Sequence, residues 1–310
     1  MNEPSRSLKQ EVSQEIQVLN GDIDRHIREG TFRRSLSVVA GISGLLGGVE
    51  VTLQHYKGSY GQRIMYSPVI LSALLFYAGI LEGISPRAER RLLPLASIAM
   101  LADGVIGFGF HVRGIARKPG GWRIPVFNIV MGPPLFAPLL LGVGGYLGLI
   151  ASLLRSEDEP PFEAITDRDI SVMPVGRAIR IRAGRFQQSM CVATTISALL
   201  NGFESLYSHY KSGFSVRAQW IPIALTPPLI AAGVGSFYSP KIARTFLPVI
   251  SGVAIAAGGV GFYYHVRGTL RRPGGMKLPF YNLVYGPPAF APLLFAATGL
   301  MGLLASRLRR

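Results

Sequence analysis

The chain contains the same stretch of sequence twice, at a fixed offset of 154 residues. Residues 32–155 align with residues 186–309 without a gap, and about 54 of the 124 aligned pairs are identical, including the strings HYK, HVRG, PGG and GPPxFAPLL. Such a match indicates a tandem duplication, so both copies are expected to adopt the same fold. We divide the chain into a polar N-terminal segment (1–31), a first repeat (32–155), a polar linker (156–185) and a second repeat (186–310).

Each repeat contains four apolar runs of about 20 residues, the length that an α-helix needs to cross a bilayer. The composition agrees, because 49% of the residues are hydrophobic and only 16% are charged. The runs cover about 36–56, 64–84, 92–112, 135–153, 190–210, 218–238, 246–266 and 289–307. We therefore expect an all-α integral membrane protein with eight transmembrane helices. Since four is an even number, the two repeats would be parallel and related by a pseudo-twofold axis along the membrane normal.

The positive charge lies mostly between the apolar runs. The chain has 32 Lys and Arg against 17 Asp and Glu, a formal net charge of +15. This placement is typical of residues that flank membrane spans and does not indicate nucleic-acid binding. The positive-inside rule favours cytoplasmic termini, so we expect a multi-pass protein of the cell membrane, plasma or inner, with the lipid bilayer as a partner.

Two polar segments lie outside the repeats. Residues 1–31 have apolar side chains at spacings of three and four, which predicts an amphipathic helix on the membrane surface or on the protein's own rim. No small-residue cleavage site follows the first apolar run, so a signal peptide is not expected. The linker has an acidic part, SEDEPPFE, and a basic part, VGRAIRIRAGR, and suggests no chemistry.

Histidines are the most informative ionisable groups in the spans. His55 and His111 lie within one turn of the C-terminal ends of the first and third spans, and His209 and His265 occupy the same positions in the second repeat. Spans one and three run in the same direction, so both imidazoles of a repeat should lie at one depth near one membrane face. Two imidazoles at matched depth can share an iron.

Glycines precede the histidines on the same helical faces: Gly48 lies seven residues before His55, and Gly104 and Gly107 lie seven and four residues before His111. The stripe could leave room for a porphyrin edge, or it could allow helices to pack closely without a ligand.

Arginines lie two residues after the histidines of the third span in each repeat. Arg113 and Arg267 could bind haem propionates or, equally well, lipid phosphate.

Two glutamates, Glu50 and Glu204, precede His55 and His209 by five residues. That spacing rotates them by about 140° from the histidine, so a bend would be needed for both to bind one ion. A carboxylate there could be a metal ligand, a proton acceptor or a buried group that joins two helices.

The strings PVFNIVMGPP and PFYNLVYGPP place an asparagine, Asn128 or Asn282, just before Gly-Pro-Pro. Two consecutive prolines remove backbone donors and interrupt a helix. We expect an interfacial elbow in which the asparagine binds the freed backbone, in preference to a ligand site.

These residues lead to a hypothesis of a duplicated, cytochrome b-like electron-transfer protein that binds haem b through its paired histidines. A quinone or a redox partner subunit would exchange electrons with it. The sequence leaves open whether histidines pair within or across repeats. Alternatives are a non-haem iron or other transition-metal site made by Glu, His and His in each repeat, a transporter, and an assembly subunit without redox chemistry. The chain has no Walker, GxSxG, CxxC or HExxH motif, so soluble-type nucleotide chemistry is not expected.

Overall fold

The computed structural model describes residues 31–85, 91–154 and 185–308, and all regular elements within them are helical. The expected amphipathic helix, except its last residue, and nearly all of the linker lie outside these ranges. The first repeat has four long helices: α2 (Thr31–Lys57), α3 (Ser67–Ile84), α4 (Leu92–Ala116) and α6 (Ala137–Leu153). The second has α8 (Arg185–Lys211), α9 (Ile221–Tyr238), α10 (Pro240–Leu270) and α12 (Ala291–Leu308).

Short elements complete both repeats. The 3-10 helices η1 (Arg63–Tyr66) and η2 (Gly121–Arg123) correspond to η5 (Arg217–Trp220) and η6 (Gly275–Lys277), and the short helix α5 (Pro125–Val130) corresponds to α11 (Pro279–Tyr285). Most helices of the second repeat begin and end 154 residues after their counterparts in the first. The main exception is α10, which begins at Pro240 and so includes a further N-terminal turn.

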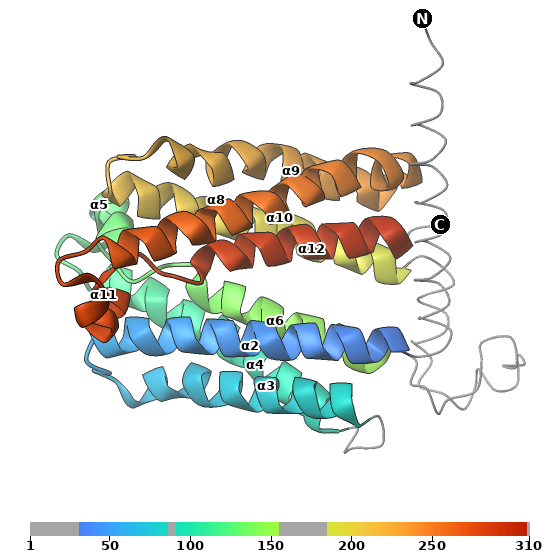
Figure 1. Cartoon of the computed structure of the whole chain (residues 1–310), viewed down its shortest axis with the longest axis horizontal. Coiled ribbons are helices and arrows are strands. Elements are labelled where there is room, and N and C mark those ends of the chain that lie inside the picture. Colours follow the sequence, from blue (N-terminus) through green and yellow to red (C-terminus); the bar gives the residue numbers. More distant parts are fainter. Residues whose placement is uncertain (1–30, 86–90, 155–184, 309–310) are drawn as a thin grey trace, which may run out of the picture.

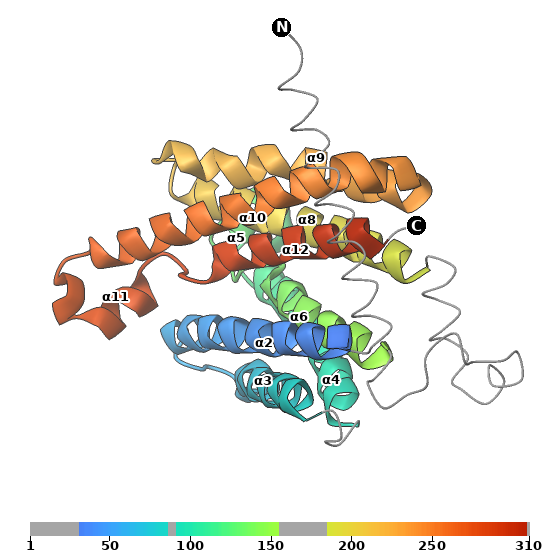
Figure 2. The same ribbon diagram turned by 45° about the vertical axis from the view of Figure 1, so that its right-hand side comes forward.

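The long helices form two groups that lie side by side (Figures 1 and 2). In the first group α2 contacts α3, α3 contacts α4, α4 contacts α6, and α6 closes the ring on α2. The helices α2 and α4 are thus on a diagonal of the group, and α8 and α10 have the same relation in the other. Both short helices lie at one end, where α5 contacts α8 and α11 contacts α2 in the opposite repeat.

The surface of the bundle is apolar while several polar side chains are buried. Helix α8 shows the pattern best: Val192, Ile196 and Phe203 are exposed, whereas Thr194 and Asn201 are buried. A helix of a water-soluble protein has the reverse arrangement, with its apolar stripe inside. Extended exposed apolar surface of this kind indicates contact with something other than water.

Five helical segments are long and apolar enough, by length and composition, to cross a membrane: Thr31–Lys57, Arg63–Ile84, Leu92–Ala116, Arg217–Tyr238 and Pro240–Leu270. Ala137–Leu153 and Ala291–Ser306 are apolar but shorter. Helix α8 has 27 residues yet is not among the five. Its polar residues, including Gln187 and Asn201, face the interior and lower its overall hydropathy. The described residues thus support five of the eight expected spans directly.

Candidate functional site

The four histidines of the spans lie in two pairs, one in each repeat. The ring centres of His209 and His265 are 6.4 Å apart, and the ring planes are nearly perpendicular, at 79°. The imidazoles of His55 and His111 are likewise within electrostatic reach of each other. Because α2 and α4, like α8 and α10, are diagonal helices, each pair faces across the interior of its own bundle. Among the two pairings that the sequence left open, the structure brings histidines together within a repeat.

Backbone carbonyls bind the Nδ1 atoms of three of these histidines. His111 Nδ1 lies 2.5 Å from the carbonyl oxygen of Pro134, and His265 Nδ1 lies 2.5 Å from that of Pro288. His55 Nδ1 lies 2.7 Å from the carbonyl oxygen of Met65. A carbonyl accepts only from a protonated Nδ1, so in the neutral ring it leaves Nε2 as the nitrogen with a free lone pair. Metal-binding histidines are commonly held in this tautomer.

His209 differs from the other three. Its Nδ1 is buried and makes no hydrogen bond of normal geometry with a described residue. The carbonyl equivalent to that of Met65 belongs to Gln219, at the same offset of 154 residues. The second pair therefore contains one imidazole with a well-formed carbonyl contact and one, His209, whose contact with the Gln219 backbone falls outside normal hydrogen-bond geometry.

A stacked pair of aromatic rings lies beside His55 and another lies beside His209. The Tyr60 ring is 5.9 Å from that of His55 and stacks on Tyr66 with ring centres 4.4 Å apart. In the second repeat Phe214 is 6.4 Å from His209 and stacks on Trp220 at 4.2 Å. The loop before each stack is sharply turned, since Tyr60 and Phe214 have φ values of 46° and 48°. The duplicated arrangement places one aromatic stack beside His55 and another beside His209.

The glycines near the histidines serve helix packing. A Cβ atom on Gly104 would lie 2.8 Å from the Pro138 carbonyl oxygen, and one on Gly107 would lie 2.9 Å from the Pro138 side chain. A Cβ atom on Gly48 would lie 2.6 Å from the Cβ of Ser72. The structure supports the second explanation for the stripe: α6 packs closely on the glycines of α4, and α3 packs closely on Gly48 of α2. These contacts leave no slot for a flat ligand beside the glycines.

The two glutamates bind the opposite repeat. Glu50 Oε2 accepts a hydrogen bond from the Phe290 backbone N–H (3.1 Å), and Glu204 Oε2 accepts one from the Phe136 N–H (2.9 Å). Glu50 Oε1 also accepts from the Gln54 side chain at 2.8 Å. No group of three or more His, Cys, Asp or Glu side chains is placed to hold a metal ion among the residues that the structure describes. The Glu, His and His set of the alternative hypothesis is therefore not assembled among these residues.

Asn128 and Asn282 hold the PGG turns. The Asn128 side-chain amide donates to the carbonyls of Pro119 (3.0 Å) and Gly121 (2.7 Å), and Asn282 does the same for Pro273 and Gly275. Both asparagines are 1% exposed. The prediction that the asparagine binds backbone is confirmed, but the carbonyls that it binds belong to the PGG turn and not to the backbone freed by Gly-Pro-Pro.

The expected propionate ligands lie at the loop end of the bundle. Arg113 is exposed and Arg267 is partly exposed, and neither forms an ion pair with another described residue. Nearby, the Lys57 ammonium lies 6.0 Å from the centre of the Tyr285 ring in the other repeat. Arg113 and Arg267 could therefore bind an anionic group at this end of the bundle.

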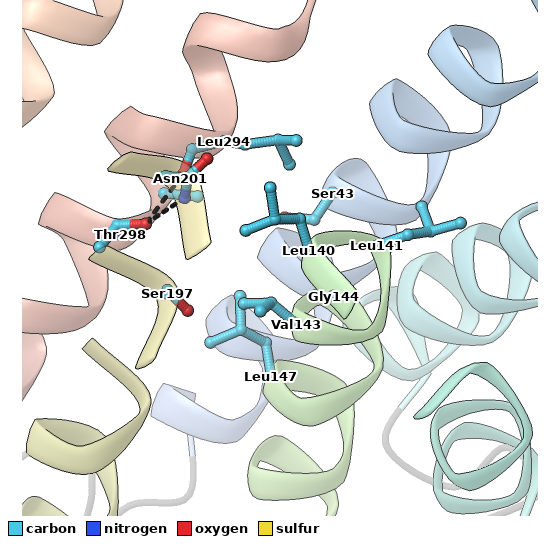
Figure 3. Close-up of a pocket in the computed structure, with 11 residues that line it drawn as sticks. Ser43, Leu140, Leu141, Val143, Gly144, Leu147, Ser197, Asn201, Leu294 and Thr298 are labelled. Atoms are coloured by element: carbon cyan, nitrogen blue, oxygen red, sulfur yellow. Dashed lines mark hydrogen bonds between the residues drawn. The ribbon is translucent and has the colours of Figure 1, made fainter. Parts of the chain in front are cut away.

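A small cavity lies between the two repeats, away from the histidines (Figure 3). The second repeat contributes polar side chains, Ser197, Asn201 and Thr298, and the first contributes mainly Leu140 and Leu147. Asn201 donates to Thr298 Oγ1 at 3.0 Å, while Ser197 Oγ has no partner among the described residues. The space is sufficient for about one water molecule and far too small for a porphyrin or a transported solute.

Sequence reasoning missed a buried ion pair. Arg33 Nε lies 2.7 Å from Glu82 Oε1, and both side chains are 3% exposed. Arg33 Nη1 also donates to the Leu154 carbonyl, at 3.3 Å. The signal was present in the duplication, because the equivalent residues are Gln187 and Ser236, so that both charges are replaced together.

No protein family, curated protein or solved structure matches the chain. The feature with the most chemical content is the pair of imidazoles in each repeat.

Proposed function

We propose that the chain is an integral membrane protein in which all eight long helices cross the bilayer, as two parallel repeats about a pseudo-twofold axis along the membrane normal. The common offset of the helix bounds supports the two equivalent halves. The exposed apolar face and buried polar face of α8 support its inclusion as a span. The buried polar side chains of α8 contact other parts of the protein, so they would not be exposed to lipid hydrocarbon.

Labelling of single introduced cysteines tests this topology. Ser59 and Ser212 precede the second span of each repeat, whereas Ser7 and Ser156 lie in the polar segments on the other side. Cysteines at the first two positions should react from one side of the membrane, and those at the last two from the opposite side. Reaction of all four from the same side would refute the eight-span arrangement.

We further propose that each repeat binds one haem b between its two histidines, and that the protein transfers electrons. The observation that carries the proposal is the pairing of imidazoles from diagonal helices, with Nδ1 atoms bound to backbone carbonyls. An imidazole nitrogen binds a first-row metal at about 2.1 Å and lies about 1 Å from its ring centre, so rings on opposite sides of one ion have centres about 6 Å apart. The 6.4 Å between His209 and His265 agrees with that value.

The number of donors favours haem over a bare ion. A haem iron takes its remaining ligands from the porphyrin and needs only two from the protein, and each repeat offers two. The glutamates that could complete a Glu, His and His set bind backbone N–H groups of the opposite repeat. Since the glycines contact neighbouring helices, the two histidines of each repeat, and not the glycine stripe, are the residues that would hold the group.

The surroundings suit a redox group near the membrane face. The haem would supply the electron-transfer chemistry, and the chain would supply ligation and local charge. Arg113 and Arg267 are available to pair with propionates at the loop end. Trp220 and Tyr66 are about half exposed beside the site, where a quinone or a redox partner subunit could approach.

A visible spectrum of the purified protein, oxidised and reduced, together with metal analysis tests the proposal. We expect a Soret band and sharp bands in the reduced state from two haems per chain. His265→Leu should remove about half of this haem, and His111→Leu with His265→Leu should remove nearly all of it. Ser208→Leu is the matched control, because it places a leucine on the exposed face beside His209 and should leave the spectrum unchanged.

The same measurements identify the alternative of a non-haem iron or other transition metal. A colourless protein that contains a stoichiometric metal, lost in His265→Leu, would replace haem by an ion held between two imidazoles. A protein without chromophore and without metal would refute both forms of the proposal and favour transport or assembly.

A further inference from the structure

The elbow after α5 connects the histidine site of one repeat to a helix of the other. The Pro134 carbonyl binds His111 Nδ1, and the next two backbone N–H groups bind α8. Leu135 N–H donates to the Tyr207 hydroxyl at 2.7 Å, and Phe136 N–H donates to Glu204 Oε2 at 2.9 Å. Three consecutive residues thus join His111 to a carboxylate of the second repeat.

The second repeat contains the equivalent arrangement. The Pro288 carbonyl binds His265 Nδ1, and Phe290 N–H donates to Glu50 Oε2 at 3.1 Å. Glu50 is also within electrostatic reach of His265 itself. The position of Tyr207 is taken by Leu53 in the first repeat, so this elbow lacks the hydroxyl contact. The carboxylate contact is therefore common to both elbows, and the hydroxyl contact is particular to one.

The carboxylates of Glu204 and Glu50 cap the N-termini of the helices that follow the elbows. The first backbone N–H groups of a helix have no partner within it, and Phe136, which precedes α6, cannot cap them with its own side chain. A carboxylate at a helix N-terminus accepts these hydrogen bonds and interacts favourably with the helix dipole. In a nonpolar setting this contact should fix the elbow firmly, because unpaired N–H groups there are costly.

We propose that Glu204 positions His111 and that Glu50 positions His265, each acting on the opposite repeat through the Gly-Pro-Pro elbow. The intuitive expectation is different: Glu204 lies five residues before His209 on the same helix and would be expected to act there. The role as ligand-positioning residues rests on the proposed function, whereas the contacts themselves do not.

Nuclear magnetic resonance of ¹⁵N-histidine-labelled full-length protein in lipid nanodiscs, without cofactor, separates the two possibilities. Single His→Leu variants assign the signals. In Glu204→Gln the His111 ring signals should shift, because the amide keeps an acceptor but loses the charge, while the His209 signals should stay in place. In Glu50→Gln the His265 signals should shift and those of His55 should not.

Two further variants keep the test decisive if a glutamine change is too mild or too disruptive. Glu204→Leu removes the acceptor and should shift His111 further than Glu204→Gln. Tyr207→Phe removes only the hydroxyl and should produce a smaller shift at His111, with no change at His265. A shift of His209 instead of His111 in the Glu204 variants, or no shift at either, would overturn the proposal.

Failure of the haem proposal is distinguishable from failure of this one. The labelled protein contains no cofactor, so the cross-repeat pattern of shifts can be present in a chain that proves to be colourless. If haem is bound, the reduced spectrum adds a second readout. Glu204→Gln combined with His265→Leu, which retains only the first site, should then show a displaced spectrum relative to His265→Leu alone, and an identical spectrum would contradict the proposal.

Discussion

Replacing the buried ion pair of the first repeat with its counterparts from the second should cost much less than removing either charge alone. Arg33 and Glu82 are 2.7 Å apart and both 3% exposed, and their equivalents are Gln187 and Ser236. Glu82→Ser leaves a buried guanidinium without its carboxylate, and Arg33→Gln leaves a buried carboxylate without its guanidinium. The double variant contains neither charge.

The magnitudes follow from the cost of unpaired buried groups. Removing one partner of a buried ion pair destabilises a protein by about 3–5 kcal/mol, so two independent losses would add to about 6–10 kcal/mol. In the second repeat Gln187 Oε1 and Ser236 Oγ are buried without partners among the described residues. Two unpaired neutral groups of this kind cost about 1 kcal/mol each. The double variant should therefore lose only about 2 kcal/mol.

Reversible unfolding in mixed detergent micelles measures all three free energies in one cycle. We expect the double variant to be more stable than either single variant, with a coupling energy of at least about 4 kcal/mol. The converse exchange is a control: Gln187→Arg alone should be strongly destabilising, and the addition of Ser236→Glu should restore much of the loss. Additive effects of Arg33→Gln and Glu82→Ser would refute the reasoning.

Two other changes test the packing and the elbow. Gly104→Ala should lower the free energy of unfolding by about 1–3 kcal/mol, because its Cβ would lie 2.8 Å from the Pro138 carbonyl oxygen. Gly109→Ala, which would meet nothing within 4 Å, should leave the free energy of unfolding unchanged or raise it by up to about 1 kcal/mol. Asn128→Ala removes the donor to two turn carbonyls and should cost about 1–3 kcal/mol. Trypsin should cut faster at the exposed Arg123 of that variant, and an unchanged cleavage rate would contradict the assigned role.

Local patterns in the sequence predicted the helices. Apolar runs and the offset of 154 residues depend on residues that are close in the chain, and the observed helices follow them. That the asparagine of each elbow binds backbone was also predictable from the helix interruption at Gly-Pro-Pro, whereas its actual acceptors, the carbonyls of the PGG turn, were not. Helix α8 is the hardest of the long helices to judge as a span, since its buried polar face makes the whole helix less apolar than its exposed surface.

The partners of the glutamates and glycines could not be predicted, because they depend on which helices pack together. The spacing of Glu50 from His55 describes a position on one helix and contains no information about the contact with Phe290, 240 residues away. The glycine stripe likewise fits a ligand slot or a helix contact equally well until Pro138 is placed against Gly104. Tertiary packing decides both questions.

The contacts that Glu50 and Glu204 make with helix N-termini of the opposite repeat explain why these partly buried acids occur in both copies. Glu82 bonds to a side chain of its own repeat, Arg33, so the two residues can be replaced together, as they are in the second repeat, and no unpaired charge results. Glu50 and Glu204 instead bind backbone N–H groups at the start of a helix in the opposite repeat. No substitution can remove those N–H groups while the helix begins there, except a proline. A carboxylate that serves the backbone of the other half has no side-chain partner to change with it, and both halves have kept theirs.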